Sequence, residues 1–117
     1  MKRTPTLPQR TENACCEPVT IAPADKGLDT VSLAARLKAL ADPTRLAMLD
    51  LLGRHGAPLC VCEITDRFPQ RQPTISHHLR ILRGAGLIST EKHGVWAYYW
   101  ATEAGTRSLA AVRALEA

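Results

Sequence analysis

Four cysteines stand in two close pairs, and cysteine thiolates are the ligands that soft ions prefer. The first pair is Cys15 and Cys16, and the second is Cys60 and Cys62, separated by one valine. Cytosolic thiols are normally kept reduced, so a disulfide framework is not expected. A lone cysteine is commonly a small buried apolar residue, but two pairs together favour a metal or metalloid site. A site built only from sulfur favours As(III), Sb(III), Cd(II), Pb(II) or Zn(II) over hard cations.

The segments that carry the two pairs differ in character. Residues 1–27 contain four prolines, few apolar residues and no helical period, which predicts a flexible N-terminal arm carrying Cys15 and Cys16. Residues 28–117 hold the apolar repeats and are long enough for one hydrophobic core but not for two. The second cysteine pair falls inside this single folded domain.

Composition and charge limit the class of protein. Of the 117 residues, 45% are hydrophobic and only 4% are aromatic, which favours a mostly helical domain. No apolar run reaches the roughly 20 residues of a membrane span, and no signal peptide is recognisable, so we expect a cytoplasmic protein without a membrane partner. A formal charge of +4 permits nucleic-acid binding. The charge is concentrated between residues 71 and 92, where four basic side chains accompany one acidic side chain.

Two helices are predicted before the second cysteine pair. The first begins near residue 29, where Asp29 or Thr30 can cap a helix whose leucines recur at i, i+4 and i+7. These leucines are Leu33, Leu37 and Leu40. The second begins at Asp42 and Pro43, a capping residue followed by proline at the first helical position. Gly53 is expected to stop this second helix.

Two short helices joined by a tight polar turn follow, and this is the helix-turn-helix arrangement. The first is expected at residues 60–68 and the second at residues 73–83. In the second helix, Ile75, Leu79 and Leu82 are expected to face the core. Its outward side chains are Thr74, His77, Arg80 and Arg83.

A hairpin and a last helix complete the predicted domain. Residues 87–91 and 95–101 alternate as strands around a turn at Lys92, His93 and Gly94. The large rings Trp96, Tyr98 and Trp100 then share one face of the hairpin. The last helix, residues 102–114, has an apolar stripe too narrow for one subunit to bury, which predicts a dimer surface. The predicted fold class is mainly α with a small β-hairpin wing, a dimeric winged helix-turn-helix.

The outward side chains of the second short helix suit double-stranded DNA. Such a helix places its N-terminal half in the major groove, where small polar side chains reach base edges. The side chains expected at base edges are Gln72, Thr74, Ser76, His77 and Arg80. Those expected to hold phosphates are Arg71, Lys92 and His93. A solvated surface is the alternative for the arginines and the lysine, and local hydrogen bonding is the alternative for Ser76 and His78. His78, beside the inward face, is assigned this structural role.

Two stretches of the chain resemble the ArsR/SmtB family of metalloregulatory repressors. They are ALADPTRLAML, which begins at Ala39, and QPTISHHLRILRGAGLI, which begins at Gln72. The resemblance covers residues 29–114. It implies a homodimeric winged-helix repressor that binds operator DNA and has no organic cofactor.

A third stretch, LCVCEI from Leu59, resembles the metal-binding segment of the family's arsenic and cadmium/lead sensors. Cys15 and Cys16 correspond by type to arm thiols of some members, so the resemblance implies Cys15, Cys16, Cys60 and Cys62 as ligands. Within the family a vicinal arm pair indicates As(III), with Sb(III) as a further inducer. Cd(II) or Pb(II) on four thiolates is the alternative, because As(III) takes only three. The family's histidine and carboxylate site on the last helix is not expected, because no histidine follows His93.

Cysteine spacing suggests how ion capture becomes DNA release. Residues i and i+2 of a helix lie about 200° apart, so Cys60 and Cys62 cannot both face one ion without a change in the first helical turn. Ion capture is therefore expected to strain the start of this helix and to shift the DNA-contacting helix at residues 73–83. A repressor whose cysteine pairs oxidise is a second interpretation. An enzyme is not expected, because the sequence contains neither a Cys-x5-Arg phosphate loop nor a glycine-rich nucleotide loop.

Overall fold

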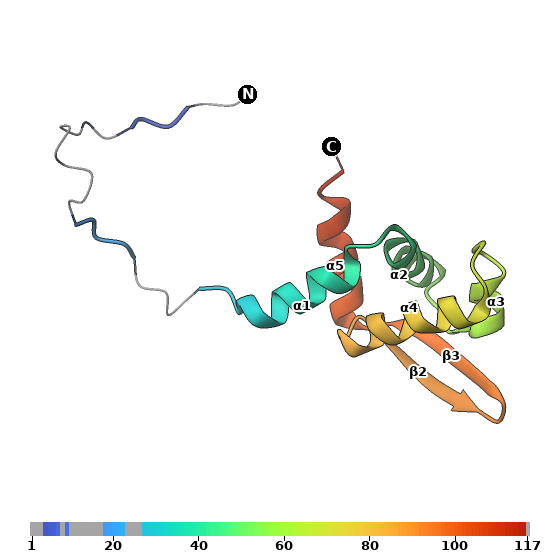
Figure 1. Cartoon of the computed structure of the whole chain (residues 1–117). Coiled ribbons are helices and arrows are strands. Elements are labelled where there is room, and N and C mark those ends of the chain that lie inside the picture. The colour runs from blue at the N-terminus through green and yellow to red at the C-terminus, as the bar shows by residue number, and fades with distance from the viewer. Residues whose placement is uncertain (1–3, 8, 10–17, 23–26, 117) are drawn as a thin grey trace.

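Helices make up most of the described chain, and a small antiparallel sheet lies at one end of it (Figure 1). The computed structural model describes residues 4–7, 9, 18–22 and 27–116, so Cys15 and Cys16 lie outside the described residues. The elements, in chain order, are α1 (Thr30–Leu40), α2 (Pro43–His55), β1 (Leu59–Cys60), α3 (Val61–Thr65), α4 (Gln72–Gly84), β2 (Ile88–His93), β3 (Trp96–Ala101) and α5 (Glu103–Arg113). The predicted mainly helical class with a hairpin wing is confirmed. None of the helices in the described ranges is long and apolar enough to cross a membrane.

Aspartate caps determine where α1 and α2 begin. The carboxylate of Asp29 accepts a hydrogen bond from the backbone N–H of Ser32 at 3.3 Å. The carboxylate of Asp42 accepts one from the backbone N–H of Arg45 at 3.0 Å, and Pro43 occupies the first turn of α2. Each cap satisfies an N–H that the helix itself cannot pair. Both predicted helix starts are confirmed.

The predicted end of α2 at Gly53 is wrong. The helix continues to His55, and Gly56 ends it in the left-handed conformation with a φ of 73°. Gly53 lies inside the helix, on the side that α5 approaches. A Cβ added to Gly53 would lie 2.6 Å from the Leu109 side chain. This glycine therefore permits close helix packing, which a reading of local stop signals cannot detect.

The inward face of α4 forms the centre of the core. Ile75, Leu79 and Leu82 are each 0% exposed, as the sequence predicts. Burial of each side chain stabilises the fold by about 1.5–3 kcal/mol. These residues pack against α1, α2, α3 and β2. The opposite face of α4 is thereby turned to solvent along its whole length.

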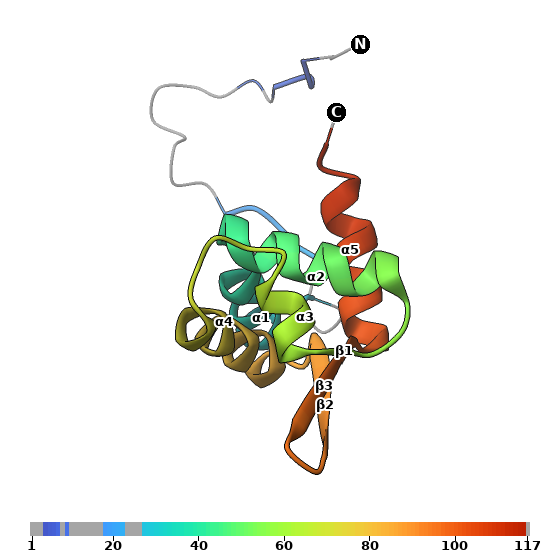
Figure 2. The same ribbon diagram turned by 90° about the vertical axis from the view of Figure 1, so that its right-hand side faces the viewer.

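The hairpin of β2 and β3 is extended by a third strand that the sequence did not predict. β3 lies between β2 and the two-residue β1, and both pairings are antiparallel. The register places Glu91 opposite Tyr98 and His93 opposite Trp96, so these side chains share the face that the aromatic alternation predicted. The tip of the hairpin projects beyond the helices in both views (Figures 1 and 2).

An ion-pair cluster holds α5 on α2. A guanidinium nitrogen of Arg113 lies 2.7 Å from the Asp50 carboxylate, and Arg54 lies 2.8 Å from it. The hydrogen bonds from Arg113 and then Arg54 lower the pKa of the Asp50 carboxyl below its ordinary value. Because these side chains are partly exposed, the pairs orient α5 more than they stabilise it.

The leucine stripe of α1 is only partly covered by the rest of the described chain. Leu40 is buried, but Leu37 is 63% exposed. The apolar side of α1 instead lines an open groove of about 310 Å³ together with α5. The groove residues are Leu33, Arg36, Leu37, Leu40, Ser108, Ala111, Val112 and Leu115.

Gly105→Ala tests the close approach of α5 to the loop before β2. A Cβ at Gly105 would collide with the carbonyl oxygen of Leu87, which already accepts a hydrogen bond from Thr102 at 3.1 Å. We expect Gly105→Ala to lower the free energy of unfolding by about 2 kcal/mol or more, measured by urea denaturation. The matched control is Gly84→Ala, because a Cβ at Gly84 meets open space. Equal urea midpoints for the two variants would contradict this packing.

Candidate functional site

Cys60 and Cys62 lie at the junction between β1 and α3. Cys60 is the last residue of β1 and the N-cap of α3, with φ −78° and ψ 159°, and it is 8% exposed. Cys62 lies in the first turn of α3 and is exposed. The predicted helix start at residue 60 is therefore wrong by one residue. Since Cys60 has extended backbone, the 200° separation of helical residues does not apply to this pair. The structure therefore does not support the prediction that ion capture strains the start of the helix for that reason.

Glu63 completes a capping box around Cys60. The backbone N–H of Cys60 donates a hydrogen bond to Oε1 of Glu63 at 3.0 Å. This bond, and a second from the thiol, lower the pKa of the Glu63 carboxyl. The Glu63 backbone N–H lowers the pKa of the Cys60 thiol, but burial and the Glu63 carboxylate raise it, and the net pKa lies above its ordinary value. Glu63 was not predicted from the sequence, although a capping residue followed three positions later by a glutamate is the recognised signal of a capping box.

The described residues contribute two thiols to a soft-ion site but not a complete one. Within the described ranges, no three His, Cys, Asp or Glu side chains lie close enough together to hold a metal ion. Cys60 and Cys62 are both free thiols. The predicted ligands Cys15 and Cys16 lie outside the described residues. A three-thiolate site therefore requires a ligand from outside the described residues or from a second copy of the chain.

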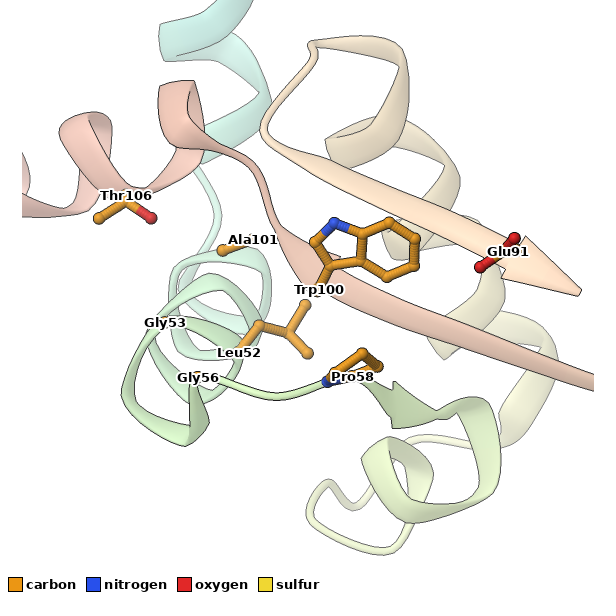
Figure 3. A pocket seen from close by; sticks show the side chains of 8 residues that line it. All are labelled: Leu52, Gly53, Gly56, Pro58, Glu91, Trp100, Ala101 and Thr106. Carbon is orange, nitrogen blue, oxygen red and sulfur yellow. The ribbon is translucent and has the colours of Figure 1, made fainter.

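The strand that ends at Cys60 is packed beside the wing. Cys60 pairs with Tyr98 of β3, and Leu59 pairs with Tyr99. Just before β1, Pro58 and the indole of Trp100 line a cavity of about 430 Å³ (Figure 3). A displacement of Cys60 would therefore disturb the start of α3 and the pairing with β3.

Most of the side chains predicted to contact DNA are exposed. On α4 and just before it, Arg71, Gln72, Thr74, His77 and Arg80 are exposed and Ser76 is half-buried. On the wing, Lys92 and His93 are exposed. The Nε2 atom of His93 lies 3.2 Å from the Glu91 carboxylate, and its ring contacts that of Tyr98 edge-on. His93 is thus engaged within the wing, whereas Lys92 is free of ion pairs in the described part of the chain.

Arg45 joins three helices and explains the position of His78. Its guanidinium donates hydrogen bonds to the carbonyl oxygens of Ala39 and Lys38 at the end of α1. It also lies 3.2 Å from Nδ1 of His78 on α4, which must accept because a guanidinium has only donors. His78 therefore takes part in packing α4 against the helices behind it. Arg45 could not be predicted from the sequence, because its partners are backbone carbonyls and a histidine 33 residues away.

Comparisons with known proteins agree with this arrangement. Residues 42–90 match the family model described as "Bacterial regulatory protein, arsR family". The chain is 51% identical over 63 residues to an HTH-type transcriptional regulator of Methanocaldococcus jannaschii, covering 54% of this chain and 70% of that protein. It is 47% identical over 62 residues to the arsenical resistance operon repressor of Escherichia coli, covering 53% of this chain and 52% of that protein. The match thus spans about half the length of the Escherichia coli repressor.

The fold is also similar to a solved winged helix. The homodimeric winged helix-turn-helix DNA-binding domain of a possible ArsR-family regulator from Mycobacterium bovis superimposes with a TM-score of 0.66. The sequences are 30% identical, and the match covers 73% of this chain and 78% of that one.

The burial of the two described thiols predicts unequal reactivity. In a Cys15→Ser/Cys16→Ser variant, Cys62 is expected to react with a chromogenic disulfide reagent at least ~10-fold faster than Cys60, because Cys62 is exposed and the pKa of Cys60 is raised. Two kinetic phases of equal amplitude are the expected result. Adding Cys62→Ser as the control should remove the fast phase alone. A single phase for both thiols would contradict the difference in burial between Cys60 and Cys62.

Proposed function

The chain belongs to the ArsR family of bacterial regulatory proteins, and we propose that it is a repressor that binds operator DNA as a homodimer and releases it when its thiolates capture As(III). The observation that carries the proposal is the place of Cys60 and Cys62. They begin the helix that packs against α4, and the outer face of α4 is polar and basic. Sensor thiols and DNA-facing side chains thus belong to neighbouring elements.

Binding of operator DNA is assigned to α4 and the wing. The first half of α4 enters the major groove, where Thr74, His77 and Arg80 reach base edges. Arg71 and Lys92 hold the phosphates on either side. The deep burial of the inner face supports this assignment, because it keeps the helix rigid while the outer side chains stay free.

Dimerisation is assigned to the groove between α1 and α5. Leu37 is 63% exposed and Leu115 is 82% exposed, and both line this groove. Monomeric soluble proteins seldom leave apolar side chains clustered in this way. A second copy of the chain, using the same surface, would cover them in a symmetric interface. The homodimeric state of the Mycobacterium bovis domain supports this choice of occupant.

The inducer is assigned as trivalent arsenic, with Sb(III) as a further inducer. Three thiols replace the three hydroxyls of arsenous acid, and three water molecules leave, so no oxidant or reductant is needed. Cys60 and Cys62 supply two sulfurs, and Cys15 or Cys16 supplies the third. The arsenical resistance role named for the Escherichia coli relative supports As(III) over the other soft ions.

Release follows from movement of the cysteine junction. Drawing the Cys60 thiol to an ion breaks the capping box with Glu63 and displaces β1 and the start of α3. Because α3 packs on α4 and β1 pairs with β3, both DNA-contacting elements shift. A coupling free energy of about 1–3 kcal/mol is ordinary for such systems.

Two alternatives use the same cysteines. Cd(II) or Pb(II) would take all four thiolates, whereas a redox sensor would oxidise the pairs without any ion. Both remain outcomes of the experiment that follows.

Arsenite is expected to weaken operator binding by about 5- to 150-fold. The measurement is fluorescence anisotropy of the reduced full chain on a duplex from its own upstream region, titrated with arsenite, antimonite, Cd(II), Pb(II) and Zn(II). A Cys60→Ser/Cys62→Ser variant should bind the duplex as the wild type does and ignore arsenite. Its control is Ser32→Ala, at an exposed position of α1 outside the groove lining, which leaves every thiol in place and should respond fully.

The pattern of responses decides among the candidate inducers. A double cysteine variant that still releases DNA with arsenite would refute the proposed site. Release by Cd(II) or Pb(II) alone would move the assignment to a four-thiolate metal sensor. Release by diamide with no response to any ion would replace the proposal by the redox interpretation.

Leu37→Glu is expected to convert the dimer to a monomer. The substitution places a charge in the apolar groove, whereas Ala34→Glu adds the same charge on α1 outside the groove lining. Light scattering during gel filtration should report a monomer for Leu37→Glu and a dimer for Ala34→Glu. Operator affinity should fall only in the monomer. A dimeric Leu37→Glu variant would exclude the groove as the interface.

A further inference from the structure

A small polar cleft lies between α4 and β3, apart from the cysteine junction. Its volume is about 180 Å³, and its lining residues are Ser76, Arg80, Arg83 and Tyr99. The first three recur at i, i+4 and i+7 along α4, beside the buried stripe of that helix. Tyr99 faces them from β3 and is half-buried. Two of the four, Arg83 and Tyr99, are outside the set of side chains assigned to DNA above.

The cleft carries positive charge and hydrogen-bond donors. Neither Arg80 nor Arg83 forms an ion pair with a carboxylate in the ranges that the structure describes. No acidic residue occurs between Asp66 and Glu91 in the sequence. Each guanidinium has five N–H donors and no acceptor, and the two hydroxyls can donate as well. This donor set is complementary to an oxyanion, since Arg binds phosphate oxygens in pairs.

We infer that this cleft binds a phosphate group of the DNA backbone, an inference that rests on the proposed function. Thr74 and His77 lie on the outward face of α4, and the cleft lies at the edge of that face nearest the sheet. When α4 occupies the major groove and the wing contacts DNA, the DNA strand that borders the groove passes between α4 and the wing. The cleft is then in the path of that strand. Inorganic phosphate has the same chemistry, and the experiment separates the two sources.

Arg83 and Tyr99 hold the phosphate, while Ser76 and Arg80, expected at base edges, border the cleft. Arg83 supplies charge and paired donors, and Tyr99 supplies a neutral donor from the wing. A phosphate contact carries no base information, so its loss weakens binding to every duplex equally. Loss of a charged contact also lowers the salt dependence of binding, by about 0.9 in the log–log slope for each phosphate, or about 1.8 for the two copies in a homodimer.

The test is the salt dependence of duplex binding by the full chain, measured by fluorescence anisotropy on operator and scrambled duplexes. We expect Arg83→Gln to weaken both complexes about 10-fold and to lower the slope by about 1.8. Arg83→Lys should restore the slope, because it keeps the charge. Tyr99→Phe should weaken both complexes without changing the slope. Arg107→Gln, on the exposed face of α5, is the matched control and should behave as the wild type.

Three outcomes would overturn the inference. One is an Arg83→Gln variant with the wild-type slope, when the wild type itself binds the operator. Another is a loss confined to the operator duplex, which indicates base contact. The third combines two results. Inorganic phosphate, compared with chloride at equal ionic strength, raises the Tm of the DNA-free wild type but not that of Arg83→Gln, and the two proteins have the same salt slope of DNA binding. This pattern indicates a site for free phosphate and not for the DNA backbone. A wild-type chain that binds no duplex would instead refute the proposed function.

Discussion

Burial of one face of α4 is the constraint on which the rest of the structure depends. Ile75, Leu79 and Leu82 are excluded from solvent, and four other elements pack around them. With its inner face held in this way, α4 has one orientation, and its polar side chains have no core contacts to make. The Arg45 guanidinium adds to this constraint by joining the end of α1 to His78. The same packing that stabilises the domain therefore also presents the surface assigned to DNA.

The junction between β1 and α3 at Cys60 links that surface to the proposed thiolate site. One residue ends β1, caps α3 and pairs with Tyr98 of the wing strand. A ligand that moves this residue must disturb the strand pairing, the capping box with Glu63, or both. Neither interaction is large, since a helix cap contributes only about 1 kcal/mol. A weakly held junction between two well-packed elements is suited to a switch, because displacing it does not unfold the core.

The parts of the fold that local chemistry determines could be predicted from the sequence. The start of α2 at Asp42 and the inward face of α4 depend on capping and on helical spacing, and both are confirmed. The strand β1 was missed because two residues have no period, and its existence depends on distant β3. Gly53 was wrongly predicted to end α2, because the reason for a glycine there is the close approach of Leu109 from α5, which is distant in the sequence. The candidate thiols and DNA side chains were chosen by residue type and stay predictions, whereas Arg83 and Tyr99 form a cleft only once the sheet lies beside α4.

The charge balance of thiol binding indicates how release must work in the proposed repressor. When three neutral thiols replace the hydroxyls of arsenous acid, the site is neutral before and after, so no new charge repels the DNA. Four thiols binding Cd(II) lose four protons and leave two net negative charges, which would weaken the attraction of nearby phosphates directly. A metalloid therefore has only movement available as its signal. The double connection of Cys60, to α3 and to β3, supplies the path for that movement.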